Sequence, residues 1–178
     1  MTILVKTTQI ADEQEIADFF RDSAGTWRSE RRYYTLPEGK TQELVSMITI
    51  DFLPKGDEEL LTLAQLHNLP NLDSLSCGAK VSWQSVDLEN LEKKVHGQTI
   101  FGALGKILYR DKGFATTKPV TADYIISQAH TLCLRTEYNR AVFEEEIKLI
   151  GDKYRTRQTI ISRDGKPLTI GQYLEKRV

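Results

Sequence analysis

The residues with the clearest chemical potential lie on two predicted strands in one stretch of the chain, residues 143–161. Successive side chains of a strand point to opposite faces, so residues two apart share a face. Glu145 therefore shares its strand face with three apolar residues: Phe143, Ile147 and Leu149. A carboxylate on such a face is costly to bury without a partner. Glu145 needs such a partner, and the second strand offers one.

That second strand carries three polar residues on one face: Arg155, Arg157 and Thr159. Arginine binds a carboxylate through two parallel hydrogen bonds, which are stronger than bonds between neutral groups. If this face meets Glu145 inside a cavity, a carboxylate and two guanidinium groups point into one apolar pocket. The alternatives are structural: Glu145 paired with an arginine for packing alone, and both arginines on a solvated strand face.

The length of the turn at residues 151–153 decides whether the two faces meet. A two-residue turn pairs Glu145 with Gln158 and turns both arginines to the other face. A three-residue loop, which includes Lys153, pairs Glu145 with Thr159 and places both arginines on its face. The sequence leaves both registers open, and the proposed site requires the second.

The rest of the chain predicts a helix followed by strands and short turns. An amphipathic pattern with acidic residues in its first turn predicts a helix over residues 12–20, which ends near Gly25. A short helix is expected at 57–67, with Asp57 as its N-cap, and a turn or short exposed helix at 87–94. Further strands are expected at 26–35, 44–52, 79–83, 97–101, 105–110, 114–121, 123–127, 132–138 and 168–177, with 123–127 and 132–138 paired across 128–130.

Antiparallel strands in such number must close or stack to hide their edges. We therefore predict a mainly β fold, an antiparallel up-and-down barrel of about ten strands that encloses a ligand cavity. A two-sheet sandwich is the alternative. No repeat or linker interrupts the pattern, so a single domain over residues 1–178 is expected.

The composition excludes several classes of protein. The 178 residues are 40% hydrophobic and 28% charged, as in ordinary globular domains, and the net charge of -1 argues against a nucleic-acid binder. There is neither an apolar run long enough for a membrane span nor a signal-peptide pattern. Cys77 and Cys133 make no disulfide framework, and the three scattered histidines predict no metal site. A cytoplasmic protein is expected.

Five segments carry a resemblance to a known family. Residues 25–27, Gly-Thr-Trp after a helix, match the G-x-W signature of lipocalin-like barrels. The longer run 19–31 resembles the start of the CpcS/CpeS-type phycobiliprotein lyases, with the form FFxxSxGxWxSxR. The strand around Trp83, a turn at 97–99 and Glu145 followed by R-T-R-Q-T also resemble that family, in its S- and U-like branch.

The resemblance implies a ten-stranded lipocalin-like (calycin) barrel with an N-terminal helix. It implies a lyase that binds an open-chain tetrapyrrole, a bilin such as phycocyanobilin, as substrate and uses no prosthetic group. The bilin is attached through a thioether to a cysteine of a phycobiliprotein subunit, with phycocyanin β and allophycocyanin as expected partners. The cyanobacterial cytosol or the plastid stroma is the expected compartment, and a homodimer or a heterodimer with a second lyase-like chain is the expected assembly.

The resemblance also implies roles for single residues. Glu145 is expected to do acid–base or orienting work on the bilin, and Arg155 and Arg157 to bind its propionates. Thr159 is expected to add a hydrogen bond, and Trp83 an aromatic wall or a core contact. Trp27 is expected to be structural, beneath an arginine at the closed end of the barrel, with Arg177 as the candidate.

Two other functions fit the same sequence. One is a carrier of a bilin or another amphipathic acid without catalysis, and the other is a scaffold subunit that needs a related lyase chain. The carboxylate of Glu145 favours the lyase, because a carrier needs the arginines but no interior carboxylate.

Overall fold

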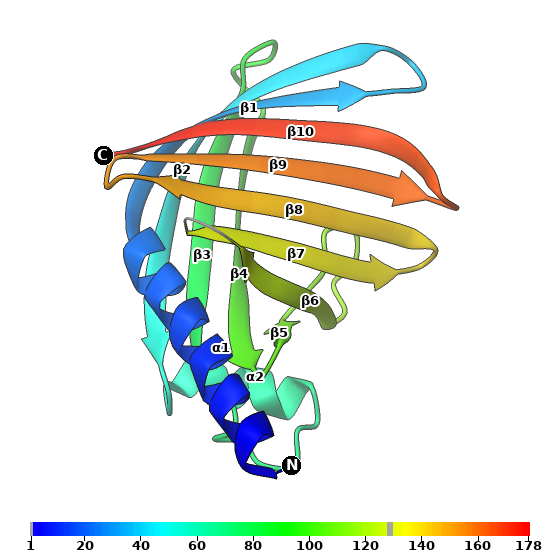
Figure 1. Cartoon of the computed structure of the whole chain (residues 1–178). Coiled ribbons are helices and arrows are strands. Elements are labelled where there is room, and N and C mark those ends of the chain that lie inside the picture. Colours follow the sequence, from blue (N-terminus) through cyan, green and yellow to red (C-terminus); the bar gives the residue numbers. More distant parts are fainter. Residues whose placement is uncertain (1, 128–129) are drawn as a thin grey trace.

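The predicted barrel is confirmed: the described strands close into one antiparallel, up-and-down barrel (Figure 1). The computed structural model describes residues 2–127 and 130–178, and for residues 2–11 the backbone alone. Each strand pairs with the next in the chain, and β1 closes onto β10. The strands are β1 (Gly25–Thr35), β2 (Lys40–Pro54), β3 (Cys77–Asp87), β4 (Lys94–Leu104), β5 (Ile107–Arg110), β6 (Val120–Ser127), β7 (Thr131–Tyr138), β8 (Ala141–Ile150), β9 (Tyr154–Arg163) and β10 (Lys166–Arg177).

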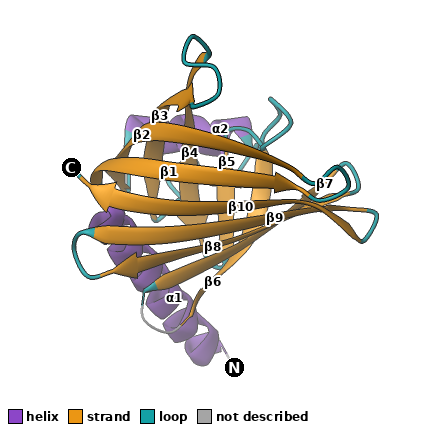
Figure 2. Cartoon of the chain, turned by 90° about the horizontal axis from the view of Figure 1, so that it is seen from above, coloured by secondary structure: helices purple, strands orange, loops and turns teal. Residues whose placement is uncertain are grey.

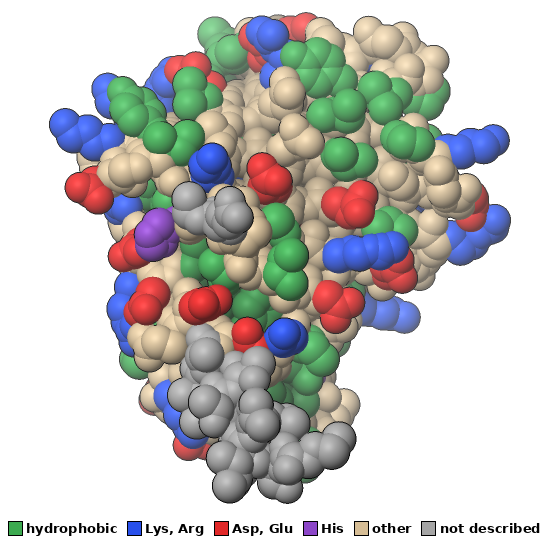
Figure 3. All heavy atoms as spheres, in the orientation of Figure 1, with side chains coloured by type: hydrophobic (Ala, Val, Ile, Leu, Met, Phe, Trp, Pro, Cys, Tyr) green, Lys and Arg blue, Asp and Glu red, His purple; other side chains and the backbone are tan. Residues whose placement is uncertain are grey.

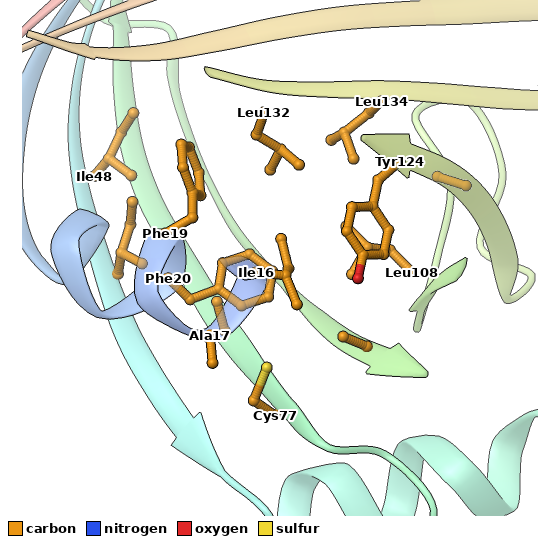
Figure 4. Close-up of a cluster of buried hydrophobic side chains, with 14 of the residues drawn as sticks. Ile16, Ala17, Phe19, Phe20, Ile48, Cys77, Leu108, Tyr124, Leu132 and Leu134 are labelled. Atoms are coloured by element: carbon orange, nitrogen blue, oxygen red, sulfur yellow. The ribbon is translucent and has the colours of Figure 1, made fainter. Parts of the chain in front are cut away.

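Helix α1 (Thr2–Ser23) covers one end of the barrel with an apolar face. Ile16, Phe19 and Phe20 are buried against inward-facing strand residues such as Ile48 and Leu132 (Figure 4). The helix begins ten residues earlier than the sequence indicated. The acidic residues of 12–15, predicted in its first turn, lie in its middle.

Helix α2 (Glu58–Leu66) confirms the second predicted helix and its cap. The Asp57 carboxylate accepts a hydrogen bond from the backbone N–H of Glu59 at 2.9 Å, as an N-cap residue does. Its buried leucines pack on the outside of the barrel in a second apolar cluster, against partly buried residues of β4 such as Ile100 and Leu104. Seen from above, α1 and α2 lie apart from one another (Figure 2).

The predicted strand at 114–121 is wrong, because residues 111–119 form a loop and β6 begins only at Val120. Side chains hold this loop in place of a strand ladder. Phe114 stacks on Phe143 with ring centroids 4.9 Å apart, and the Ala115 N–H donates to the Tyr138 hydroxyl at 2.8 Å. The predicted strand at 123–127 is the larger part of β6, which pairs with β7 as expected, and residues 128 and 129 of their turn lie outside the described residues.

Trp27 marks the closed end of the barrel, as predicted. Its side chain is fully buried, and its indole N–H donates to the carbonyl of Ser23 at 2.9 Å. The Arg177 guanidinium lies 4.2 Å from the centroid of its ring and donates to the carbonyls of Asp22 and Ala24. This cation–π contact and these bonds tie the end of α1 to β10.

The surface mixes both signs of charge. On the face shown in Figure 3, Lys and Arg side chains alternate with Asp and Glu, and neither sign gathers over one element. Neither of the two described helices is long and apolar enough to cross a membrane.

Candidate functional site

The turn between β8 and β9 has the length that the site requires. Residues 151–153 form a three-residue loop, in which Gly151 has a φ of 57°, a left-handed value that glycine adopts without strain. Glu145 consequently pairs with Thr159, and Ile147 pairs with Arg157. The second of the two registers left open by the sequence is the observed one, and both arginines share the inward face of Glu145.

This inward face lines a cavity of about 900 Å³ inside the barrel. The cavity extends from Phe19 and Phe20 of α1 to loop 111–119, and its walls include Ile48 and Leu134. A cavity of this size, apolar with a few polar groups, is typical of a site for a small organic ligand.

Glu145 and Arg157 form an ion pair on the cavity wall. Glu145 is only 4% exposed, whereas 21% of the Arg157 side chain remains accessible. The Arg157 guanidinium also lies 5.2 Å from the ring centroid of Tyr173. Burial works to lower the pKa of Arg157, but the charges of Glu145 and its other neighbours outweigh burial and raise this pKa. Glu145 is thus a buried carboxylate held in place by a permanent cation.

Arg155 faces the same cavity but has a partner of its own. Its guanidinium bonds to Glu175, which is fully buried and also accepts from the Ser29 hydroxyl at 3.0 Å. The Arg155 guanidinium lies 5.0 Å from the Trp27 ring centroid. Burial lowers the pKa of Arg155. Burial works to raise the pKa of Glu175, but the positive charge of Arg155 outweighs it, so the pKa of that carboxyl is lowered.

Thr159 places a hydroxyl in the cavity wall beside Glu145. Its side chain is 3% exposed, and its oxygen makes no hydrogen bond of good geometry with any residue that the structure describes. Its hydroxyl interacts with the side chain of Tyr173, which also lines the cavity, so a ligand can reach both groups together.

Trp83 lines the cavity from β3 and lies opposite Gly97 of β4. The strand predicted at 97–101 is confirmed as part of β4, so residues 97–99 do not form the turn that the family resemblance implied. The reason for the glycine is steric: a Cβ at position 97 would lie 2.6 Å from the Trp83 ring. The indole therefore lies across the bare backbone of the neighbouring strand, which fixes the aromatic wall.

Two buried charged residues were not predicted: Arg110, which lines the cavity, and Glu175, the partner of Arg155. Glu175 and Arg110 are both buried and face inward from β10 and β5. The signal that identified Glu145, a charge in phase with buried positions, was present in both strands. It is hard to recognise there, because Arg110 ends a strand of only four residues and Glu175 lies among charged neighbours.

The cysteines take no part in this arrangement. Cys77 is buried below the cavity, and burial raises the pKa of its thiol to about 11, which suppresses the reactive thiolate. Cys133 is partly exposed and pairs with Glu146 on β8, on the outer face of the barrel. Within residues 2–127 and 130–178 no group of three His, Cys, Asp or Glu side chains is placed to hold a metal ion.

The chain is similar to proteins of one family. A family model described as "CpeS-like protein" matches residues 15–178. A protein of Nostoc sp. named "Putative phycocyanobilin lyase CpcS 2" is 59% identical over 178 residues, which cover 100% of this chain and 99% of that protein. The "Chromophore lyase CpcS/CpeS" of Thermosynechococcus vestitus is 31% identical, over 85% of this chain and 86% of that protein.

The solved structure of the S-type phycobiliprotein lyase CPES from Guillardia theta has the same fold. It superposes with a TM-score of 0.78 at 24% identity, covering 94% of this chain and 97% of that one.

Replacing Glu175 with glutamine tests the buried pair at the closed end. We expect the free energy of unfolding at pH 7 to fall by about 3–5 kcal/mol, because Arg155 is left charged and buried without its partner. The folded-state pKa of Glu175 lies below its ordinary value of 4.5, so its ionised form adds stability above that pH. That contribution is lost as the pH falls through the folded-state pKa. The difference in free energy of unfolding between the wild type and Glu175→Gln therefore becomes smaller at low pH.

Urea unfolding at several pH values between 7 and 3 measures this difference. The double variant Arg155→Leu, Glu175→Leu is the control, and it recovers most of the stability because no charge is left unpaired. A difference that does not change with pH would contradict the ion-pair account.

Replacing Gly97 with alanine tests the fit of the Trp83 wall. The new methyl group cannot occupy the space of the indole, so we expect Trp83 to move and the protein to lose about 1–3 kcal/mol of stability. Near-UV circular dichroism reports the tryptophan environment, and urea unfolding reports the stability. Gln98→Ala, on the exposed face of the same strand, is the matched control. Adding Trp83→Leu to Gly97→Ala restores room for the new methyl group. If Gly97→Ala alone changes neither the circular dichroism nor the stability, the steric argument is wrong.

Proposed function

Since the chain belongs to the CpeS-like family, we propose that it is a phycobiliprotein lyase, which binds an open-chain tetrapyrrole and attaches it to a cysteine of a phycobiliprotein subunit. The family match covers residues 15–178, nearly the whole chain. Relatives are named phycocyanobilin lyases and chromophore lyases, among them one that is 59% identical along its entire length.

The observation that carries this proposal is the carboxylate of Glu145 inside the cavity, paired with Arg157. Pyrrole N–H groups of a bilin are donors, and a buried carboxylate is an acceptor that can collect several of them. A carrier would gain the same hydrogen bonds, so what favours a lyase is the proton that this carboxylate can hold or pass. An interior carboxylate therefore favours a protein that acts on the tetrapyrrole.

The bond-forming step is an addition in which no atom is lost. The partner's cysteine thiolate forms the C–S bond to the ethylidene carbon, the exocyclic double bond breaks, and the thiol proton ends on the neighbouring ring carbon. Protonation of the tetrapyrrole makes the ethylidene group a better electrophile, and Glu145 is placed to hold or pass that proton. The chain supplies the conformation of the bilin and the partner supplies the nucleophile, so its contribution is largely positioning.

The other predicted residues have roles that differ with their surroundings. Arg157 is partly accessible from the cavity, which supports contact with a propionate as well as with Glu145. The hydroxyl of Thr159, which lines the cavity beside Tyr173, supports a hydrogen bond to the ligand. Trp83 offers a flat wall to the conjugated system. For Arg155 the propionate role stays a prediction, and its bonds to Glu175 support a positioning role at the closed end.

The finer points of the proposal concern substrate and partners. We propose phycocyanobilin as the bilin on the names of the relatives. Phycocyanin β or allophycocyanin is proposed as the acceptor on the family resemblance of the sequence. We further propose that the chain works in the cytoplasm or the plastid stroma, as a homodimer or with a second lyase-like chain, and that it binds the bilin as substrate without a prosthetic group.

Reconstitution tests the function and the role of Glu145 together. Phycocyanobilin and an apo-phycocyanin or apo-allophycocyanin subunit are incubated with the chain, then denatured, and zinc-stained gels report thioether-bound pigment. We expect attachment well above the spontaneous level with the wild type, and a loss of about 100-fold in rate or more with Glu145→Gln. Bilin absorbance in the same variant reports whether the pigment still binds.

Glu146→Gln is the matched control, since the neighbouring carboxylate points out of the barrel and is exposed. It should attach bilin at the wild-type rate. Binding of bilin without attachment above the spontaneous level would support the carrier in place of the lyase. Attachment only after addition of a second lyase-like chain would identify a paired subunit. Equal rates for Glu145→Gln and the wild type would remove Glu145 from the reaction.

A further inference from the structure

Arg110 is a buried cation on the cavity wall that has no acidic partner among the described residues. It is the last residue of β5 and only 6% exposed. Its Nε and one terminal nitrogen, Nη1, are buried and make no hydrogen bond. The neighbouring Asp111 is turned to other groups: its Oδ1 accepts from the Thr99 hydroxyl at 2.7 Å and the Ile100 N–H at 3.0 Å, and its Oδ2 lies 3.9 Å from the Lys112 ammonium.

Two aromatic rings hold the guanidinium of Arg110 in place. Its central carbon lies 4.6 Å from the ring centroid of Phe101 and 4.7 Å from that of Phe114. Cation–π attraction stabilises the charge but leaves the N–H donors without acceptors. Because Phe114 is itself stacked on Phe143, the guanidinium is fixed in a site from which water is largely excluded.

The remaining buried charges of the cavity cancel one another. Glu145 is paired with Arg157, and Glu175 is paired with Arg155. Arg110 is therefore the excess positive charge among the buried ionisable groups that line the cavity within the described residues. The charge of Glu145 favours the ionised form of Arg110, but Glu145 bonds to Arg157 instead.

Two further cations lie along the same cavity but are reached by water. Arg31 is half-buried and donates to the Ser29 hydroxyl at 3.3 Å. Lys112 is 38% exposed and lies 3.9 Å from Asp111. Neither has to be neutralised by a ligand, whereas a fully enclosed guanidinium does.

A buried, unsatisfied guanidinium is costly in the empty protein. Burial lowers the pKa of Arg110. The ordinary pKa of an arginine side chain lies so far above neutral pH that the group nevertheless stays charged. Such a cost is retained where a ligand repays it, because an anion that enters the cavity meets a desolvated, prepositioned cation.

We propose that Arg110 is the carboxylate receptor of the cavity, and that its guanidinium pairs with one propionate of the bound bilin. The inference rests on the proposed function, since it takes the bilin as the ligand, and it adds a residue outside the R-x-R pair. It also distinguishes the arginines: Arg110 has no carboxylate of the protein to neutralise, whereas Arg157 and Arg155 are each paired with one.

Titration of two ligands into two protein variants tests the role of Arg110 directly. Phycocyanobilin and its dimethyl ester, in which both propionates are uncharged, are titrated into the wild type and Arg110→Met, with bilin absorbance as the readout. We expect the wild type to prefer the free acid, and the ester-to-acid ratio of Kd values to fall by about 10- to 100-fold in Arg110→Met. Arg135→Met, which removes an exposed arginine from the outer face of β7, is the matched control and should keep the wild-type ratio.

The thermal stability of the ligand-free proteins separates ligand binding from a structural role. Removing an unsatisfied buried charge should leave the Tm of Arg110→Met equal to or above that of the wild type. Arg110→Lys keeps the charge but loses the guanidinium donors. Its ester-to-acid ratio of Kd values should lie between those of the wild type and Arg110→Met. It also serves as the test variant if Arg110→Met does not fold.

The outcomes distinguish this inference from the proposed function. A reduced ratio with an undiminished Tm supports Arg110 as the receptor. If the wild type binds pigment but every Arg110 variant shows the same ester-to-acid ratio, the inference is wrong and the bilin-binding function stands. If the wild type binds neither pigment, both are wrong.

Discussion

The cost of burying charge inside an apolar barrel is the constraint on which the rest of this structure depends. Glu145, Arg110 and the two arginines of β9 occupy a cavity whose other walls are largely hydrocarbon and aromatic. Each would be expensive there without a partner. The three-residue turn at 151–153 limits that cost, because one residue fewer would turn Arg155 and Arg157 away from Glu145 and leave the carboxylate unpaired.

The charges are also divided along the barrel. At the end covered by α1, Arg155, Glu175 and Trp27 form a closed group whose bonds are made within the chain. Towards loop 111–119, Arg110 keeps donors without partners. One end of the cavity thus has all its charged groups bonded within the chain, and the other has donors free for a ligand. Such a site is formed before the ligand arrives, which reduces the entropic cost of binding.

Much of this could be predicted from local sequence, and the rest could not for definite reasons. The shared face of Arg155, Arg157 and Thr159 follows from the two-residue period of a strand. The register depends on a single turn residue, which no periodicity reveals. Arg110 was missed because its significance lies in the absence of a partner. Loop 111–119 was taken for a strand because Phe114 packs on a distant strand, a contact that local pattern does not contain.

The central claim is that the cavity fixed by this register is where the bilin binds. A crystal structure of the chain with phycocyanobilin tests it most directly. The account predicts the tetrapyrrole inside the barrel, with pyrrole N–H groups directed at Glu145 and one propionate on Arg110. Pigment bound on the outer surface, or inside the barrel with both Glu145 and Arg110 making no contact to it, would contradict the account.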